Sequence, residues 1–201
     1  MNLIKEKPIL FNSEMVRAVL EGRKTQTRRV VKLAPGEHLV KLESGQINGV
    51  QSHSGKVKDL KCPYGKPSDR LWVREKFTTL SHNSSDEEGD AWIYAASENG
   101  EAWESEAEGW RWKPSIFMPR AASRILLEVI DVRVEKLKKM NRGDAMSEGC
   151  PFPNIASEKS PLLWFRDLWD SINKARGCDW DSNPLVWVVE FKVLEVKGAL
   201  S

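Results

Sequence analysis

Apolar residues recur at helical spacing near the start of the chain, within residues 13–20. Apolar positions three or four residues apart place one hydrophobic face on a helix, so this segment predicts a short amphipathic helix. That face carries Met15, Val16, Val19 and Leu20. Asn12 or Ser13 can cap the start of the helix, and Gly22 can end it in the left-handed conformation that glycine tolerates.

A second, shorter helix is predicted in the last third of the chain. Asn141 and Asp144 have the spacing of a capping pair at a helix start. We expect this helix to run to Glu148 and to stop at Gly149.

A third helix is predicted to begin at Ser160, because a capping residue followed by proline is typical of a first helical turn. One face of this segment carries Leu162, Phe165, Trp169 and Ile172. Gly177 is the expected end of this helix.

Runs of apolar residues with strand-like alternation predict six strands. They cover residues 7–11, 28–33, 70–75, 91–95, 125–137 and 185–196. In the fifth run the apolar positions change from one face to the other near Ile130 or Asp131, which predicts a β-bulge. The sixth run starts apolar on both faces, so we expect it in the interior of a sheet.

Strands with helices inserted between them predict an α+β fold, a small mixed β-barrel with peripheral helices rather than a doubly wound sheet. We expect one domain over residues 1–201, with long insertions near residues 34–61 and 81–109. The first strand and the last strand are expected to close the barrel. Residues 81–109 are expected to be mobile or to form a lid, because they are rich in acids and small residues.

The composition, 40% hydrophobic and 30% charged over 201 residues, is typical of a soluble globular protein. No apolar run approaches the roughly 18 residues of a membrane helix, and no secretory leader is evident. We therefore expect a cytoplasmic protein with no membrane partner. The scattered Cys62, Cys150 and Cys178 fit a reducing compartment. We expect no metal and no cofactor, and a zinc site of these cysteines with one histidine is the alternative.

Charge is uneven along the chain, although the net charge is only +2. Residues 1–80 hold about twice as many Lys and Arg as Asp and Glu, whereas residues 81–109 hold no Lys or Arg. The basic part indicates a surface for nucleic acid or nucleotides, and a solvated surface is the alternative. Basic residues are densest in residues 21–29, Glu-Gly-Arg-Lys-Thr-Gln-Thr-Arg-Arg, directly after the first predicted helix.

Several motifs together resemble the ASCH domain, a relative of the PUA fold, and in particular its phage and prophage members. They are residues 7–11, Lys-Pro-Ile-Leu-Phe, continuing through residues 22–29; residues 67–75, Pro-Ser-Asp-Arg-Leu-Trp-Val-Arg-Glu; and residues 118–124, Met-Pro-Arg-Ala-Ala-Ser-Arg. Residues 169–173 and 187–191 also fit the pattern. The resemblance implies a PUA-like barrel and a nucleoside, nucleotide or RNA ligand.

Some small bacterial members of this family have a similar Gly-Arg-Lys-Thr-x-Thr loop and are amidohydrolases that deacetylate N(4)-acetylcytidine. The resemblance implies that Lys24 and Thr27 act here together with Glu148. The chemistry is consistent, because Thr27 offers a nucleophile and Lys24 becomes a base if burial or neighbouring cations lower its pKa. Glu148 can orient the pair or carry a proton. A noncatalytic site, in which Lys24 binds phosphate, is the alternative.

Seven further residues are candidates for substrate binding, because they lie in the basic loop or at turns that a barrel would aim at its mouth. They are Arg23, Arg28, Arg29, Arg74, Glu75, Arg120 and Trp72. Arginine can bind phosphate with two hydrogen bonds or stack on a base, and tryptophan can also stack. An ion pair between Glu75 and one of the arginines is the alternative for that part of the set.

Overall fold

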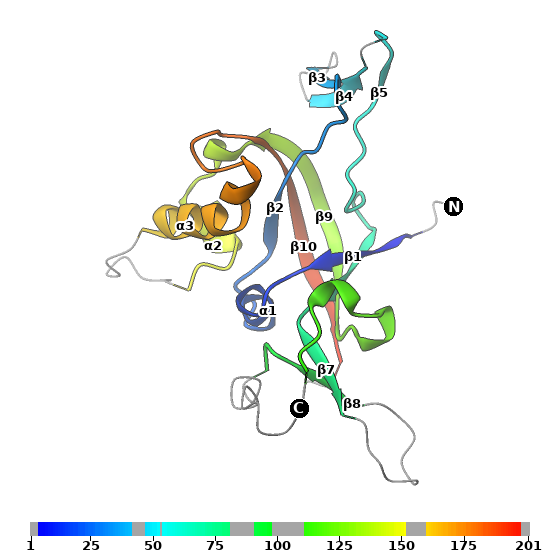
Figure 1. Ribbon diagram of the computed structural model, residues 1–201, viewed down its shortest axis with the longest axis vertical. Helices are drawn as coiled ribbons and strands as arrows, with labels where there is room; N and C mark the ends of the chain where they lie inside the picture. Colours follow the sequence, from blue (N-terminus) through cyan, green and yellow to red (C-terminus); the bar gives the residue numbers. More distant parts are fainter. Residues whose placement is uncertain are drawn as a thin grey trace.

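The computed structural model describes residues 4–41, 47–52, 54–80, 91–97, 111–151 and 160–197. A five-stranded mixed sheet forms the centre of the molecule, in the order β1-β6-β9-β10-β2 (Figure 1). Its strands are β1 (Glu6–Leu10), β2 (Gln26–Val30), β6 (Arg70–Arg74), β9 (Ile125–Lys136) and β10 (Leu185–Val196). β1 and β6 are parallel, and the other neighbouring pairs are antiparallel.

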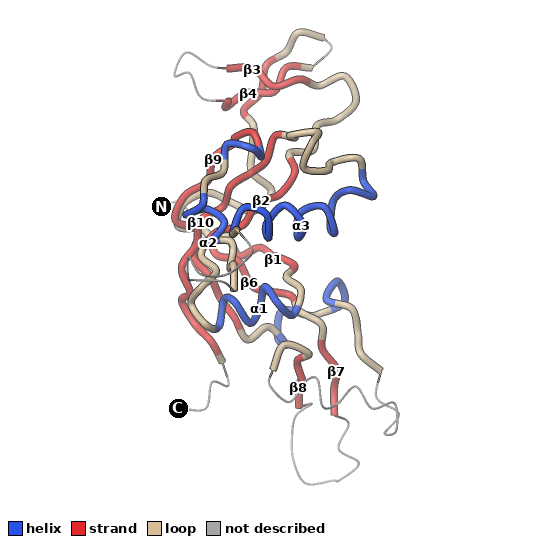
Figure 2. Tube along the Cα trace, turned by 90° about the vertical axis from the view of Figure 1, so that its left-hand side faces the viewer, coloured by secondary structure: helices blue, strands red, loops and turns tan. Residues whose placement is uncertain are grey.

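Two smaller sheets lie at opposite ends of the long axis of the molecule (Figure 2). One contains β3 (His38–Lys41), β4 (Ile47–Gln51) and β5 (Val57–Asp59), so the insertion near residues 34–61 folds as a small antiparallel sheet. The other pairs β7 (Phe77–Leu80) with β8 (Ala91–Tyr94). Most of residues 81–109 lie outside the described residues, and the expectation of a lid there stays a prediction.

The helices confirm the α+β class and several of the predicted boundaries. They are α1 (Ser13–Leu20), α2 (Arg142–Ser147) and α3 (Pro161–Asn173), with 3-10 turns η3 (Ser115–Phe117), η4 (Arg120–Ala122), η5 (Leu137–Lys139) and η6 (Lys174–Arg176). The Asn12 side chain caps α1 by accepting from the Met15 N–H at 2.8 Å. Asn141 and Asp144 form the predicted capping box of α2. Gly177 follows η6 in the left-handed conformation.

The expected closure of a barrel by the first and last strands is wrong. β10 is an interior strand, as predicted, but its two edges are already paired with β9 and β2. No edge of β10 therefore remains for β1, which pairs with β6 at the other side of the sheet. β1 and β2 are the two edges of an open sheet within the described residues.

The predicted bulge in β9 is confirmed at Ile130. Glu190 of β10 pairs with Asp131, whereas the next residue, Phe191, pairs with Val129. Ile130 is thus the extra residue on β9. An extra residue of this kind shifts the alternation of the strand, which explains why the apolar positions change face in the sequence.

Two buried clusters hold the helices against the sheet. In the larger cluster, Val16 and Val19 of α1 pack with sheet residues that include Leu71. The second cluster packs Phe165 and Trp169 of α3 against β10. Ile172, which the sequence places on the same face of α3, is 38% exposed because the last turn of the helix borders a cavity.

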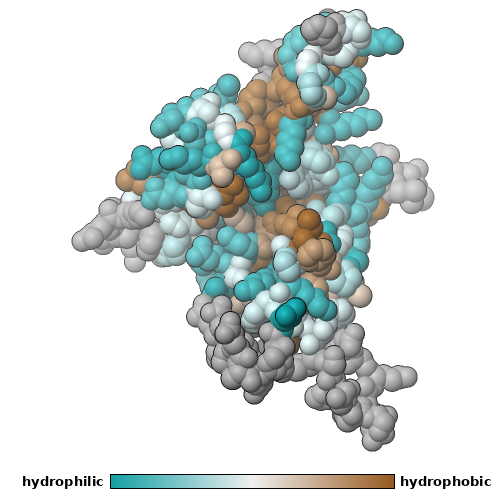
Figure 3. All heavy atoms as spheres, viewed as in Figure 1, coloured by the Kyte–Doolittle hydropathy of each residue, from teal (hydrophilic) through white to brown (hydrophobic). Residues whose placement is uncertain are grey.

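The surface is mixed in polarity. On the face shown in Figure 3, hydrophilic residues cover most of the side that carries α2 and α3, and hydrophobic residues gather nearer the middle. Among the described residues, no helix is long and apolar enough to cross a membrane.

A tight junction joins the end of α1, the start of β2 and the end of α2. Lys24 and Glu148 form an isolated antiparallel bridge, and the Thr25 N–H donates to the Ser147 carbonyl at 2.9 Å. Gly149 continues this junction with a φ of +100°. A Cβ at Gly149 would lie 2.8 Å from the Cβ of Ala18. Both the backbone conformation and the close approach therefore require glycine here.

We expect Gly149→Ala to lower the free energy of unfolding by about 2–3 kcal/mol, because it adds a steric conflict to a strained backbone conformation. Gly177→Ala is the matched control, since Gly177 also has a positive φ, of 73°, but a Cβ there would meet nothing within 4 Å. The control should lose only about 1–2 kcal/mol. Chemical denaturation measures both values, and equal losses would contradict the close packing of this junction.

Candidate functional site

Lys24 is the buried centre of the candidate site. Its backbone N–H donates to the Ala18 carbonyl at 2.9 Å, which holds the residue at the end of α1. Its ammonium nitrogen, Nζ, donates to the Gln26 carbonyl at 2.8 Å, the Glu148 carbonyl at 2.9 Å and Oε2 of Glu148 at 2.8 Å. The side chain has no exposed surface. All three protons of a charged Lys24 amine therefore have acceptors.

Glu148 connects this lysine to a second cation. Oε2 accepts from Lys24, and Oε1 accepts from Nη1 of Arg28 at 3.2 Å. The residue is 3% exposed, so both ion pairs are shielded from water. Each oxygen of this carboxylate therefore faces a cation.

Arg28 is shared among three carboxylates. Besides Glu148, its Nη2 lies 3.0 Å from Glu135 on β9 and 3.3 Å from Asp144 on α2. The Nε–H of Arg28 is the exception, since it is buried and has no hydrogen-bond partner within the part of the chain that the structure describes. A buried donor without a partner costs free energy.

Burial lowers the pKa of the Lys24 amine below its ordinary value. The charge of Glu148 and its hydrogen bond oppose this effect, whereas Arg29 and Arg28 add to it. Transfer of an ammonium group out of water disfavours the charged form, so a neutral amine becomes accessible at a lower pH than in solution. A lowered pKa is what the sequence analysis required for Lys24 to act as a base.

Thr27 lies on β2 with its side chain fully buried. Its Oγ1 accepts a hydrogen bond from Nη1 of Arg29 at 2.8 Å. Arg29 is fixed in turn by a hydrogen bond from Nη2 to the Leu10 carbonyl at 3.0 Å. The ring of Phe11 lies beneath both cations, 5.6 Å from Nζ of Lys24 and 5.7 Å from the guanidinium carbon of Arg29.

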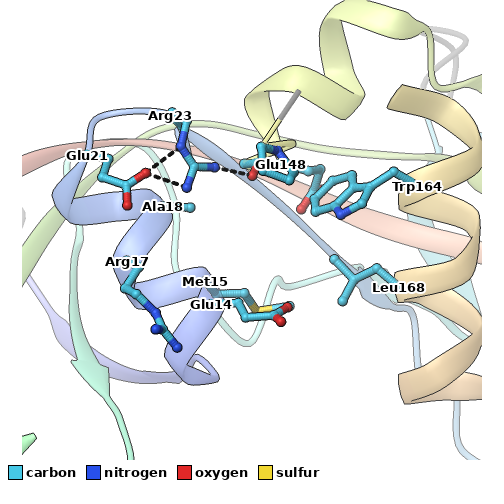
Figure 4. A pocket seen from close by; sticks show the side chains of 11 residues that line it. Glu14, Met15, Arg17, Ala18, Glu21, Arg23, Glu148, Trp164 and Leu168 are labelled. Carbon is cyan, nitrogen blue, oxygen red and sulfur yellow. Dashed lines mark hydrogen bonds and ion pairs between the residues drawn. The ribbon is translucent and has the colours of Figure 1, made fainter. Parts of the chain in front are cut away.

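Two cavities meet at Glu148. The larger, of about 720 Å³, runs along β2 and α3 and is lined by Phe11, Arg28, Arg29 and Trp169 among others. The smaller, of about 220 Å³, lies between α1 and α3 (Figure 4). Met15 and Leu168 line both cavities and point toward each other from the two helices. Glu148 is therefore the one residue of the predicted Lys-Thr-Glu set that lines a cavity.

Arg23 lies at the rim of the smaller cavity, where it pairs with Glu21 and donates to the Gly149 carbonyl at 2.5 Å (Figure 4). This contact ties the basic loop to the end of α2. The candidates Arg23, Lys24, Thr27, Arg28, Arg29 and Glu148 thus belong to one region of the fold.

The other predicted binding residues gather elsewhere. Arg74 donates to the carbonyls of Ile116 and of Met118, and its guanidinium lies 5.2 Å from the ring of Trp72. Arg120 lies over the same ring at 6.0 Å and pairs with Glu6. None of these three candidates, Trp72, Arg74 and Arg120, lines either of the two described cavities.

Glu75 is engaged in a separate buried pair. Both of its carboxylate oxygens accept from Arg124, each at 2.9 Å. The Arg124 guanidinium in turn lies 4.2 Å from the ring of Tyr94. The geometry matches the ion-pair alternative for Glu75, although Arg124 is the partner rather than one of the candidate arginines.

Sequence reasoning missed the carboxylates Glu135 and Asp144 as partners of Arg28. The spacing of Asp144 from Asn141 in the sequence predicted that Asp144 caps the start of α2, but it did not predict a contact with Arg28. Glu135 carried none, because its contact depends on how β9 lies beside β10 and β2. Among the described residues, no group of three or more His, Cys, Asp or Glu residues is placed to hold a metal ion.

No protein-family model matches the sequence, and no curated protein matches it either. Two solved structures are similar in backbone. A protein of the DUF984 family from Enterococcus faecalis superposes with a TM-score of 0.46 at 10% identity, over 100% of this chain and 88% of that one. An ASCH domain from Lactobacillus crispatus gives 0.40 at 15% identity, over 94% and 79%. Similarity at this level carries no conclusion about family or activity, so the ASCH resemblance stays a prediction.

We expect Glu148→Gln to lower the free energy of unfolding by about 3–5 kcal/mol, because it leaves Lys24 buried without a counter-charge. Adding Lys24→Met should restore most of this loss, since Arg28 keeps Glu135 and Asp144. Chemical denaturation of the single and double variants gives both numbers.

The surface pair of Lys58 with Glu37 is the control for this experiment. Lys58→Met should cost less than about 1 kcal/mol, because Lys58 is exposed. A Glu148→Gln variant as stable as the wild type would show that Lys24 does not depend on this carboxylate.

Proposed function

We propose that the chain is an amidohydrolase that removes an acyl group from the exocyclic amine of a nucleobase, with N(4)-acetylcytidine as the substrate to test. The observation that carries the proposal is the fully buried Lys24 amine, whose pKa burial lowers and whose partner Glu148 lines a cavity of about 720 Å³. A cavity of this size is within the usual range for small-molecule sites.

Thr27 is the nucleophile in this proposal. The neutral Lys24 amine takes the hydroxyl proton while Oγ1 attacks the acyl carbon. The C–N bond then breaks, and the ammonium of Lys24 returns the proton to the leaving amine. Water hydrolyses the resulting ester, which releases acetate and regenerates Thr27. Arg29, which donates to Oγ1, stabilises this oxygen while its proton leaves and before its bond to the acyl carbon is complete.

Arg28 and Glu148 support this chemistry in different ways. Arg28 lines the larger cavity, so its positive charge is available to stabilise the acyl oxygen, where negative charge develops during the attack. Glu148 holds the lysine nitrogen in place and stabilises its ammonium form once the proton has been transferred.

A noncatalytic site for a nucleotide or RNA is the second candidate. It is favoured by one observation: Arg28 and Arg29 line the larger cavity, whereas Lys24 and Thr27 line neither of the two described cavities. In this case Lys24 and Glu148 only fix the arginines, and the protein binds its ligand without changing it.

Thr27→Val removes the hydroxyl while nearly keeping the side-chain shape, and we expect it to lower kcat/KM by about 100- to 10,000-fold. Chromatographic detection of cytidine released from N(4)-acetylcytidine measures this. Thr78→Val is the matched control, since Thr78 is also a buried threonine but its hydroxyl donates to the Arg111 carbonyl, outside the site. Calorimetry on the same variants should show that ligand affinity is largely kept. If the wild type binds cytidine derivatives but never releases acetate, the hydrolase proposal fails and the binding function remains.

The pH dependence tests Lys24 directly. Only the neutral amine accepts a proton, so kcat/KM should rise with pH through the lowered pKa of Lys24 and then level off. Lys24→Arg should lose nearly all turnover at every pH, because a guanidinium does not release its proton in this range. An activity that falls as the pH rises over the same range would exclude Lys24 as the base.

A further inference from the structure

The larger cavity has an unbalanced set of charges. Its lining includes four cations and one carboxylate, namely Arg28, Arg29, Lys32, Arg176 and Glu148. Cavity walls of one sign raise the local concentration of ligands of the opposite sign. The net charge that a ligand meets in the cavity therefore depends on which of these cations are already paired with a carboxylate of the protein.

Two of the five groups are neutralised within the protein. Glu148 is shared by Lys24 and Arg28, and Arg28 has Glu135 and Asp144 as well. The network therefore contains three carboxylates and two cations, and Glu135 also lies 3.8 Å from Arg133.

The remaining three cations face no carboxylate of the described residues. Arg29 donates only to neutral oxygens, those of the Thr27 hydroxyl and the carbonyls of Arg28 and Leu10. Lys32 and Arg176 form no ion pair with any residue that the structure describes. The cavity thus holds a surplus of positive charge that an anionic ligand would balance.

These three cations come from two walls of the cavity. Arg29 lies on β2, and Lys32 follows two residues after the end of that strand. Arg176 comes from η6, which continues α3 (Figure 1). At strand spacing Lys32 lies about 13 Å along the chain from Arg28, which contacts Glu148. The surplus charge therefore extends along β2, away from the buried Lys24–Glu148 pair.

The rest of the lining is suited to a ring system. It includes the aromatic side chains of Phe11, Tyr64, Phe165 and Trp169. Aromatic side chains stack on bases without regard to their sequence, whereas cations bind the phosphate. Both kinds of group are present in one cavity.

We propose that Arg29, Lys32 and Arg176 form a phosphate subsite, so that the ligand of the larger cavity is a phosphorylated nucleoside rather than a free nucleoside. This inference rests on the proposed function for the identity of the base, but not for the phosphate. A cavity of about 720 Å³ fits a single nucleotide, either free or at a chain end.

Calorimetric titration of cytidine and of cytidine 5′-monophosphate into the full-length protein tests the subsite. The wild type should bind the monophosphate at least about tenfold more tightly, because hydrogen bonds to a charged group contribute on that scale. In Lys32→Ala/Arg176→Ala this preference should largely disappear, while the affinity for cytidine changes little. Inorganic phosphate, followed by phosphorus NMR, should bind the wild type and not this variant.

Lys139→Ala/Lys174→Ala is the matched control. It removes the same net charge from two exposed lysines that do not line the cavity, and Lys174 lies only two residues from Arg176. The control should keep the preference for the monophosphate. If the control loses as much of the preference for the monophosphate as Lys32→Ala/Arg176→Ala does, the subsite is overturned. The preference would then depend on the overall charge of the protein and not on these two residues.

The remaining outcomes separate this inference from the hydrolase proposal. A preference for the monophosphate without any release of acetate supports the subsite and rejects the hydrolase. If acetate is released but cytidine and its monophosphate bind with equal affinity, the subsite alone is rejected. The subsite is also rejected if inorganic phosphate does not bind. A short RNA that binds more tightly than the monophosphate, with a salt dependence that weakens in Lys32→Ala/Arg176→Ala, supports the subsite and assigns the phosphate to a polynucleotide.

Discussion

The buried contact between Lys24 and Glu148 is the interaction on which the candidate site depends. Both side chains are almost completely removed from water, and the desolvation of two charges is costly unless each finds its partners. Here the lysine nitrogen has three acceptors and the carboxylate faces two cations. A well-packed apolar pair in the same place would often be at least as stable. Stability alone therefore does not account for a charged pair at this place.

The same contact joins parts of the chain that lie far apart in the sequence. Lys24 comes from the turn after α1, Glu148 from the end of α2, and Arg28 extends the network to Glu135 on β9. Gly149 permits the close approach, because any Cβ there would meet Ala18. The fold thus holds these candidate residues by backbone pairing and ion pairs together.

The larger cavity combines buried polar, aromatic and cationic side chains in its lining. At one end Arg28 has a buried N–H without a partner among the described residues, next to the Lys24–Glu148 pair. Aromatic side chains line the cavity, and cations without carboxylate partners line it as well. The two proposals assign an acyl group, a base and a phosphate to these three sets of side chains. The two proposals share Arg29 but depend otherwise on different residues, Lys24 and Thr27 in one and Lys32 and Arg176 in the other, so they can fail separately.

The sequence by itself determined the local elements and named the candidate residues of the site. The ends of α1 follow from Asn12 and Gly22, and the bulge in β9 follows from the change of apolar face at Ile130. The sequence of the basic loop identified Lys24, Thr27 and Arg28 as candidates. These features depend on neighbours a few residues away, which a single sequence contains. Tertiary structure alone decided that the sheet stays open, that Arg28 meets Glu135, and that Glu75 pairs with Arg124 instead of joining the site. Those outcomes depend on which strand edges are already occupied and on which distant charges remain to be neutralised, and neither is encoded at any one position of the chain.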